Sequence, residues 1–193
     1  MGLGLARHLS RSNEVRIGSR DPTRARAAAS RVPGVGGCAN LVAAKWCDVA
    51  VVAMPFGAVE GLKDYVGALS GKLVLSMVNP LKPQGGLFRY ASEGRAAAQM
   101  MADALPESTV ATAFNNVPAS FLRKPRSEAD VLVAADTREG FERAAEVVRG
   151  VAGLRPLYVG PLSEAETIER LTVIFLNAAK LNGGSGLSLK LVS

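Results

Sequence analysis

Short apolar runs alternate with helical patterns along most of the chain. The runs that predict strands are residues 14–18, 49–53, 73–78, 110–114, 131–135 and 156–159, with a shorter one at 37–39. Residues 49–53 are all apolar, which is typical of a strand covered on both faces of a sheet.

Recognisable start signals precede the helical patterns between these runs. Asp21 and Pro22 predict an N-cap and a first turn before residues 23–30. Similar signals precede residues 41–46 and 94–105, and a short helix is expected to end near Ser10. Because strands and helices alternate, the sequence predicts an α/β fold with a Rossmann-like, doubly wound, mostly parallel sheet.

The carboxyl end has a different pattern. Residues 164–181 form the longest helical stretch, and its apolar positions recur every three or four residues at Ile168, Leu171, Ile174, Phe175, Ala178 and Leu181. A glycine-rich break and an apolar tail follow. We therefore expect a nucleotide-binding domain over residues 1–160 and a small helical appendage over 161–193. The appendage either closes the cleft of its own subunit or contacts a second copy in a homodimer.

Composition narrows the class of protein. Hydrophobic residues make up 48% and charged residues 21% of the 193 residues, as in an ordinary globular protein. The longest apolar stretch is broken by Pro55 and falls short of the roughly 18 residues that a membrane span needs. Two cysteines and a single histidine, His8, argue against a metal site or a histidine-centred triad. We expect a cytoplasmic protein without a metal or a membrane partner.

The net charge of +6 is concentrated near the amino terminus. Residues 1–31 contain seven arginines but only Glu14 and Asp21 as acidic residues. Such a field favours an anionic partner, such as a phosphorylated cofactor, although a solvated basic face is an equally simple interpretation. Nucleic acid is disfavoured because the first 45 residues contain no aromatic side chain that could stack on a base. The strand pattern near residue 14 also disfavours an organelle import peptide.

The ends of the predicted strands are the places to look for a ligand, because doubly wound sheets bind ligands there. Ser19 and Arg20 follow the first strand, and Arg24 lies one turn into the next helix. Hydroxyl and guanidinium groups at this position suit the 2′-phosphate of NADP, whereas NAD would need an acidic residue. Asp21 is an acidic residue next to this position and counts against NADP, although its place before Pro22 is well explained as a helix cap.

Later strand ends offer apolar and amide groups. Met54 and Pro55 could pack against a nicotinamide ring, and Asn79, Asn115 and Asn116 could bind a carboxamide or a sugar hydroxyl. Each asparagine is also an ordinary turn residue. No nucleophile, base or paired carboxylates stand out, so no catalytic residue is assigned. Hydride transfer between two cofactors needs none, because the cofactors supply the chemistry.

Several segments together resemble the NADPH-dependent F420 reductases, also called F420H2:NADP oxidoreductases. The segments are Gly18-Ser19-Arg20, Asn79-Pro80, residues 114–119, and residues 153–157 with 160–163. The resemblance implies hydride transfer between NADP(H) and the deazaflavin coenzyme F420. It places Ser19, Arg20 and Arg24 at the 2′-phosphate. The other implied cofactor-binding residues are Gly2, Met54, Pro55, Asn79 and Ala119 toward the pyrophosphate and nicotinamide, and Asn115, Asn116, Val117 and Pro118 toward the deazaflavin.

The sequence departs from the family pattern in two places. Asn115 stands where the archaeal pattern has a histidine. The family also opens with a strand and a glycine-rich turn, of which only the last glycine, near Gly2, has a counterpart here. Without that central strand we expect two strand edges that have no partner strand. The strand would be missing because the start codon is read too far downstream, because the chain is shortened, or because the protein has diverged. The alternatives are a reductase of another acceptor, such as a flavin or a ferric chelate, and a nucleotide-binding protein without catalysis.

Overall fold

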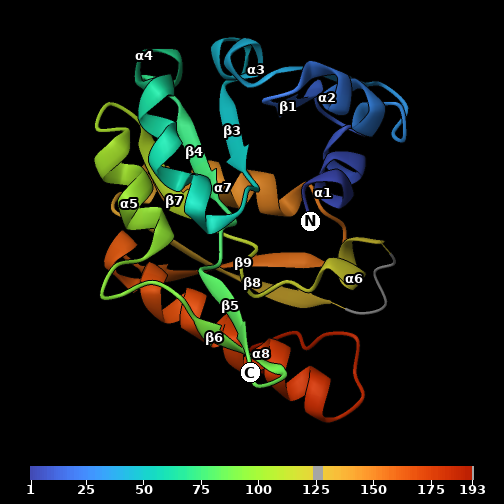
Figure 1. Cartoon of the computed structure of the whole chain (residues 1–193), viewed down its shortest axis with the longest axis vertical. Coiled ribbons are helices and arrows are strands. Elements are labelled where there is room, and N and C mark those ends of the chain that lie inside the picture. The colour runs from blue at the N-terminus through green and yellow to red at the C-terminus, as the bar shows by residue number, and fades with distance from the viewer. Residues whose placement is uncertain (124–127, 193) are drawn as a thin grey trace.

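The strands of the protein form a parallel pair, a larger and mostly parallel sheet, and a hairpin. The computed structural model describes residues 1–123 and 128–192 (Figure 1). Strands β1 (Val15–Ser19) and β2 (Val35–Ala39) make a parallel pair. The larger sheet has the order β3-β4-β7-β8-β9. Its strands are β3 (Val49–Val52), β4 (Leu73–Ser76), β7 (Thr109–Thr112), β8 (Ala129–Ala135) and β9 (Leu154–Gly160).

The larger sheet is mostly parallel, as the sequence predicts. All of its pairs are parallel except β7 with β8. Helices and 3₁₀ turns connect the strands of the chain: α1 (Gly2–Leu9), α2 (Pro22–Ala29), α3 (Asn40–Trp46), η1 (Phe56–Tyr65), α4 (Val66–Leu69), α5 (Ala97–Ala104), α6 (Ala119–Arg123), α7 (Arg138–Arg149), η2 (Leu162–Glu164) and α8 (Ala165–Leu181). The α/β Rossmann-like class is therefore confirmed.

The two parallel sheets do not join. Within the described residues, β1 pairs only with β2, and β3 pairs only with β4, so each keeps one edge without a strand partner. We expected these two open edges because the family that the sequence resembles has a further central strand, which this sequence lacks. The start of α1 lies near one of them, since a Cβ added to Gly2 would sit 3.4 Å from the Cβ of Ala53, directly after β3.

Side chains of β4 alternate between the two faces of the larger sheet. Leu73 and Leu75 join a core with α7, whereas Val74 joins a second core that includes Met101 of α5. This two-residue period explains why an uninterrupted apolar run forms a central strand here, because both faces are covered by helices. Figure 1 shows α5 and α7 separated by the sheet.

A hairpin and a long helix are among the elements that lie outside the sequence-based expectations. A hairpin joins β5 (Leu81–Gln84) and β6 (Leu87–Tyr90) through Gly85 and Gly86, whose φ angles are 57° and 77°. Two adjacent positive φ angles favour glycine, and paired glycines between short apolar runs are a hairpin signal that we did not use. Helix α7 was also missed, although Thr137 accepts a hydrogen bond from the Gly140 amide as its N-cap.

Helix α8 is turned relative to its predicted apolar face. Its buried residues are Ala165, Ile168, Glu169, Thr172 and Ala179, whereas Ile174 and Leu181 are 62% and 70% exposed. The buried face therefore includes a carboxylate and a hydroxyl, which hydrophobic spacing alone cannot anticipate. In residues 1–123 and 128–192, no helix is both long enough and apolar enough to cross a bilayer.

Candidate functional site

The carboxyl ends of β3, β4 and β7 form one edge of the larger sheet, because the three strands are adjacent and parallel. Met54 follows β3 and is half-buried, and Pro55 next to it is exposed. Asn79 follows β4, and Asn115 follows β7. The structure thus brings together residues that are up to 61 positions apart in the sequence. Ligands of doubly wound sheets bind at such an edge.

Asn115 uses its whole amide inside the protein. Its Nδ2 donates to the Val78 carbonyl and to the Asn79 Oδ1, each over 3.0 Å. Its Oδ1 accepts from the Thr112 hydroxyl at 2.8 Å. Since the side chain is buried, it holds the ends of β4 and β7 together rather than offering a free donor. Asn79 is half-buried and more exposed than Asn115, but its amide is also hydrogen-bonded inside the protein, since its Nδ2 donates to the Asn115 carbonyl at 3.4 Å.

A left-handed residue places Asn115 in this position. Phe114 is buried and has a φ of 65°, a conformation that costs a non-glycine residue about 1 to 2 kcal/mol. Packing and hydrogen bonds around the turn offset this cost. The Val117 amide donates to the Phe114 carbonyl at 3.1 Å, and the Thr172 hydroxyl of α8 donates to the Asn115 carbonyl at 2.9 Å. Helix α8 therefore reaches the edge where the ligand is expected.

Asn116 is bound to the backbone of β8. Its Nδ2 donates to the Asp130 carbonyl at 2.7 Å, and its Oδ1 accepts from the Leu132 amide at 3.1 Å. Its amide thus completes the edge of a strand and leaves only main-chain groups of this residue for a ligand. Of the following residues, Val117 is buried, Pro118 is half-buried and Ala119 is exposed.

The arginines expected at the 2′-phosphate lie at the end of β1. Arg20 is exposed, and the side chain of Arg24 is 86% exposed. Asp21 caps α2, because its Oδ1 accepts from the Thr23 amide at 2.8 Å, which confirms its assignment as a helix cap. Its other oxygen lies 3.6 Å from Nε of Arg24, an exposed pair that is easily replaced by a phosphate. The Ser19 hydroxyl accepts from the Asp21 amide at 3.2 Å.

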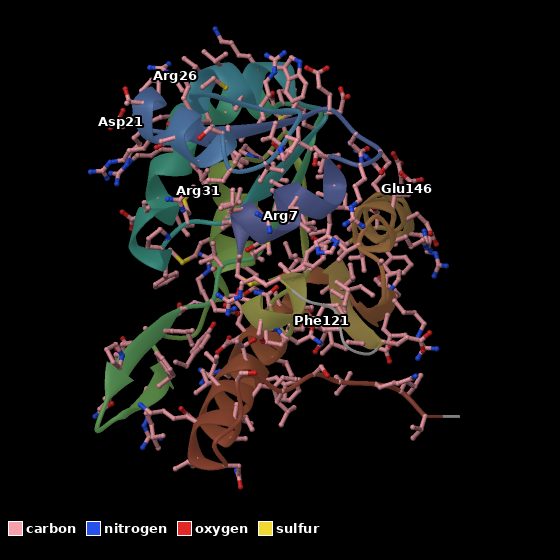
Figure 2. All side chains as sticks on the ribbon, turned by 90° about the vertical axis from the view of Figure 1, so that its right-hand side faces the viewer. Arg7, Asp21, Arg26, Arg31, Phe121 and Glu146 are labelled. Carbon is pink, nitrogen blue, oxygen red and sulfur yellow. The ribbon has the colours of Figure 1, made fainter. Side chains whose placement is uncertain are left out.

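Further arginines lie on the same side of the molecule. Figure 2 shows Arg26 of α2 beside Asp21, whereas Arg7 lies on α1, farther from Asp21. The Arg7 guanidinium donates to the Arg31 carbonyl at 3.4 Å, which links α1 to the end of α2. The concentrated positive charge of the sequence is therefore a surface around the β1 end and the first two helices.

A buried carboxylate fastens α8 to two neighbouring elements. Glu169 accepts hydrogen bonds from the Tyr90 hydroxyl at 2.8 Å and from the Ala97 and Ala98 amides at 3.0 and 3.3 Å. Burial raises the pKa of Glu169 to about 7, while these hydrogen bonds act in the opposite direction. Burial, together with the Glu169 carboxylate, also raises the pKa of Tyr90.

The hairpin after Asn79 is therefore held at several points. Beside the Tyr90 contact, Asn177 of α8 accepts from the Phe88 amide at 2.8 Å and donates to the Phe88 carbonyl at 2.9 Å. The Arg170 guanidinium lies 4.3 Å from the centre of the Tyr90 ring. Sequence reasoning missed Glu169, Thr172 and Asn177. The available signal was polar residues among the apolar positions of a long helix.

The fold and the arrangement of its strands define a Rossmann-like α/β protein. Comparison with solved structures supports the class. The chain superposes on a crystal structure from Arthrobacter sp. FB24, provisionally described as an F420-dependent NADP reductase, with a TM-score of 0.88 at 20% identity, covering 100% of this chain and 94% of that one. A Streptomyces aurantiacus imine reductase gives 0.62 at 17% identity, covering 94% of this chain and 59% of the other. At these identities the likeness shows the fold alone.

Sequence comparisons are more specific. A family model described as "NADP oxidoreductase coenzyme F420-dependent" matches residues 1–80. The F420-dependent NADP reductase of Methanothermobacter thermautotrophicus is 35% identical, covering 91% of this chain and 83% of that protein. Its counterpart from Methanothermobacter marburgensis is 32% identical, covering 91% and 86%. The chain belongs to the family of F420-dependent NADP oxidoreductases.

Proposed function

We propose that the protein binds NADP(H) and transfers hydride between it and coenzyme F420. Family membership supports the reaction class, and the exposed guanidiniums of Arg20 and Arg24 beside Ser19 carry the choice of NADP over NAD. A 2′-phosphate at this corner would receive charge-assisted hydrogen bonds from both arginines, displacing Asp21 from Arg24.

The remaining part of the cofactor would lie toward the larger sheet. The start of α1 at Gly2 lies beside Ala53, so its free amides are close to the end of β3 and suit a pyrophosphate. Met54, Pro55, Asn79 and Ala119 would border the nicotinamide, with Pro118 toward the acceptor. Bound NADP(H) and F420 supply the hydride chemistry, and these residues bind the two rings and orient them face to face.

The side-chain amide of Asn115 already has hydrogen-bond partners within the protein, which limits the contacts that it can make with the acceptor. Where the archaeal pattern has a histidine, this chain has a side chain that is fully hydrogen-bonded to its own strand ends. It therefore gives the deazaflavin no direct hydrogen bond from that position. A flavin or a ferric chelate is the alternative acceptor, and a nucleotide-binding protein without catalysis is the second alternative.

Calorimetric titration with NADPH and with NADH tests the cofactor. We expect NADPH to bind more tightly, and the preference to fall by about tenfold to a hundredfold in Arg20→Ala and Arg24→Ala, since a hydrogen bond to a charged group contributes about 1.5 to 3 kcal/mol. Arg149→Ala is the control, because it removes one exposed arginine from α7, away from the end of β1. Equal affinity for the two nucleotides would contradict the phosphate site.

Turnover tests the acceptor. Oxidation of NADPH with F420, with FMN and with ferric citrate should be fastest with F420. Faster reduction of FMN or of the ferric chelate would support the alternative reductase. Tight NADPH binding without turnover of any acceptor would support the non-catalytic interpretation.

The exposed flank of α8 supports a further proposal, that two copies associate through this helix. Ile174 and Leu181 are exposed on one side of α8, and Leu191 and Val192 of the tail are also exposed. Exposed apolar side chains on one side of a helix are typical of an interface.

A further inference from the structure

The carboxylate of Asp130 is buried at the start of β8 and is 2% exposed. Arg155 of β9 binds it with two parallel hydrogen bonds, from Nε to Oδ1 at 2.7 Å and from Nη2 to Oδ2 at 3.0 Å. This two-point geometry is the strongest arrangement of such a pair. The pKa of Asp130 is lowered, chiefly by the hydrogen bonds from Arg155, so the carboxylate is charged at neutral pH. Arg155 belongs to the Gly153–Leu157 segment singled out in the sequence, for which the proposed function gives no role.

The same pair binds the C-terminal tail, defined here as residues 185–192. The Leu191 amide donates to Oδ2 of Asp130, and Nη2 of Arg155 donates to the Leu191 carbonyl at 3.3 Å. The Asp130 amide donates to the Leu189 carbonyl at 2.7 Å, which makes an antiparallel bridge. The tail is thus held to the beginning of β8 through both side-chain and main-chain groups.

The other end of the tail lies across the segment expected to border the acceptor. The Ser120 hydroxyl donates to the Ser185 carbonyl at 3.3 Å. A Cβ added to Gly186 would lie only 2.4 Å from the Cβ of Pro118, so the tail backbone approaches Pro118 more closely than any other residue type would allow.

Asp130 also binds the segment that is expected to border the acceptor, because its main-chain carbonyl accepts a hydrogen bond from Nδ2 of Asn116. A single buried residue therefore binds both the Asn116 end of the segment and the tail that covers Pro118. If the contact with Arg155 were lost, the buried charge would be uncompensated, and the tail would lose its side-chain anchor.

We propose that Asp130 and Arg155 are positioning residues that clamp the C-terminal tail across Pro118, so that the tail forms one wall of the acceptor end of the crevice. The acceptor part of this inference rests on the proposed function, whereas the clamp itself does not. The pair touches neither the cofactor nor the acceptor and acts through the tail.

Variants at two positions separate the clamp from the wall. Arg155→Met removes the guanidinium, and Arg155→Lys keeps the charge without the two-point geometry. Gly186→Ala leaves Asp130 and Arg155 intact and pushes the tail away from Pro118. The controls are Arg149→Ala, which breaks an exposed pair with Glu142, and Gly67→Ala, whose added Cβ would meet open space.

Hydrogen exchange of the tail peptide and steady-state kinetics are measured on each full-length variant. We expect exchange at Leu191 to accelerate at least tenfold in Arg155→Met and to be partly restored in Arg155→Lys. With F420 as the varied substrate, KM should rise about tenfold in Arg155→Met and Gly186→Ala, as for the loss of one good contact, with kcat and the NADPH affinity within about twofold of wild type. Both controls should resemble wild type.

Each contrary result is informative. Unchanged exchange in a folded Arg155→Met variant would overturn the clamp, and faster exchange with an unchanged KM would overturn the wall. If Arg155→Met fails to fold, Gly186→Ala still decides the wall, and Arg155→Lys decides the clamp. If the wild-type protein does not turn over F420, the proposed function and the wall fail together, while exchange at Leu191 still decides the clamp.

Discussion

Replacing Glu169 with glutamine should remove much of the pH dependence of folding stability. The carboxylate lies between β6, α5 and α8, with Tyr90 as a hydrogen-bond donor and with Glu166 and Arg170 as the charged neighbours on its own helix. Burial raises its pKa from 4.5 to about 7. The folded protein therefore holds this proton over a range of pH in which the unfolded chain has released it.

The sign follows from proton linkage. A raised carboxyl pKa gives a contribution that is fully present below about pH 4.5 and is lost as the pH rises through about 7. A difference of about 2.5 units corresponds to about 3 kcal/mol, since one unit is about 1.4 kcal/mol. Most of that loss falls between about pH 5 and pH 8. Glu169→Gln carries no titrating group, so its free energy of unfolding should be flatter over this range.

Urea unfolding at pH 5, 6, 7 and 8 measures the effect. The quantity compared is the change in unfolding free energy between pH 5 and pH 8 for wild type, Glu169→Gln and the control Glu142→Gln, whose carboxylate is exposed on α7. Wild type and control should lose about 2 to 3 kcal/mol more than Glu169→Gln. Parallel curves for all three proteins would refute the argument that burial, rather than hydrogen bonding, dominates the environment of Glu169.

Three further changes have expected outcomes. Gly37→Ala should lower the unfolding free energy by about 1 to 3 kcal/mol in a urea melt, because its Cβ would lie 2.5 Å from the backbone of Ala25. Met101→Ala should cost about 2 to 5 kcal/mol in the same assay, because Met101 is fully buried. Ile174→Glu should shift sedimentation toward the monomer if α8 pairs two copies, and identical sedimentation of variant and wild type would contradict that interface.

The elements that the sequence predicted best are those whose signal is local. The apolar run at 49–53 gave β3 within one residue, and Asp21 caps α2 as its position before Pro22 suggested. The helix expected at 94–105 begins later, at Ala97. Glu169 of the distant helix α8 binds the Ala97 and Ala98 amides, and Gln99 of α5 itself binds the Ala96 amide. A partner 72 residues away leaves no mark at the helix start.

The sequence predicted which residues lie at the candidate site, but it did not predict which of their side chains are already hydrogen-bonded within the protein. Strand-end reasoning located Asn79, Asn115 and Asn116 correctly after their strands. It could not show that Thr112 and the backbone of β8 use the amides of Asn115 and Asn116, because these contacts depend on strand order and on the left-handed turn at Phe114. Asn79 is the most exposed of the three, although its amide also hydrogen-bonds to Asn115, and it was indistinguishable from the other two in the sequence.

The contrast between side chains that are hydrogen-bonded inside the protein and side chains that are exposed has a consequence for ligand specificity. At the carboxyl ends of the larger sheet, Asn79 and the apolar residues Met54 and Pro118 are half-buried and Pro55 is exposed. The exposed charge lies instead at Arg20 and Arg24 beyond β1, in the other sheet. A ligand with an anionic end and a flat, weakly polar end fits this separation, since each end meets matching chemistry. Discrimination among nucleotides should therefore come from the arginines, and discrimination among acceptors from the shape of the walls around Pro118.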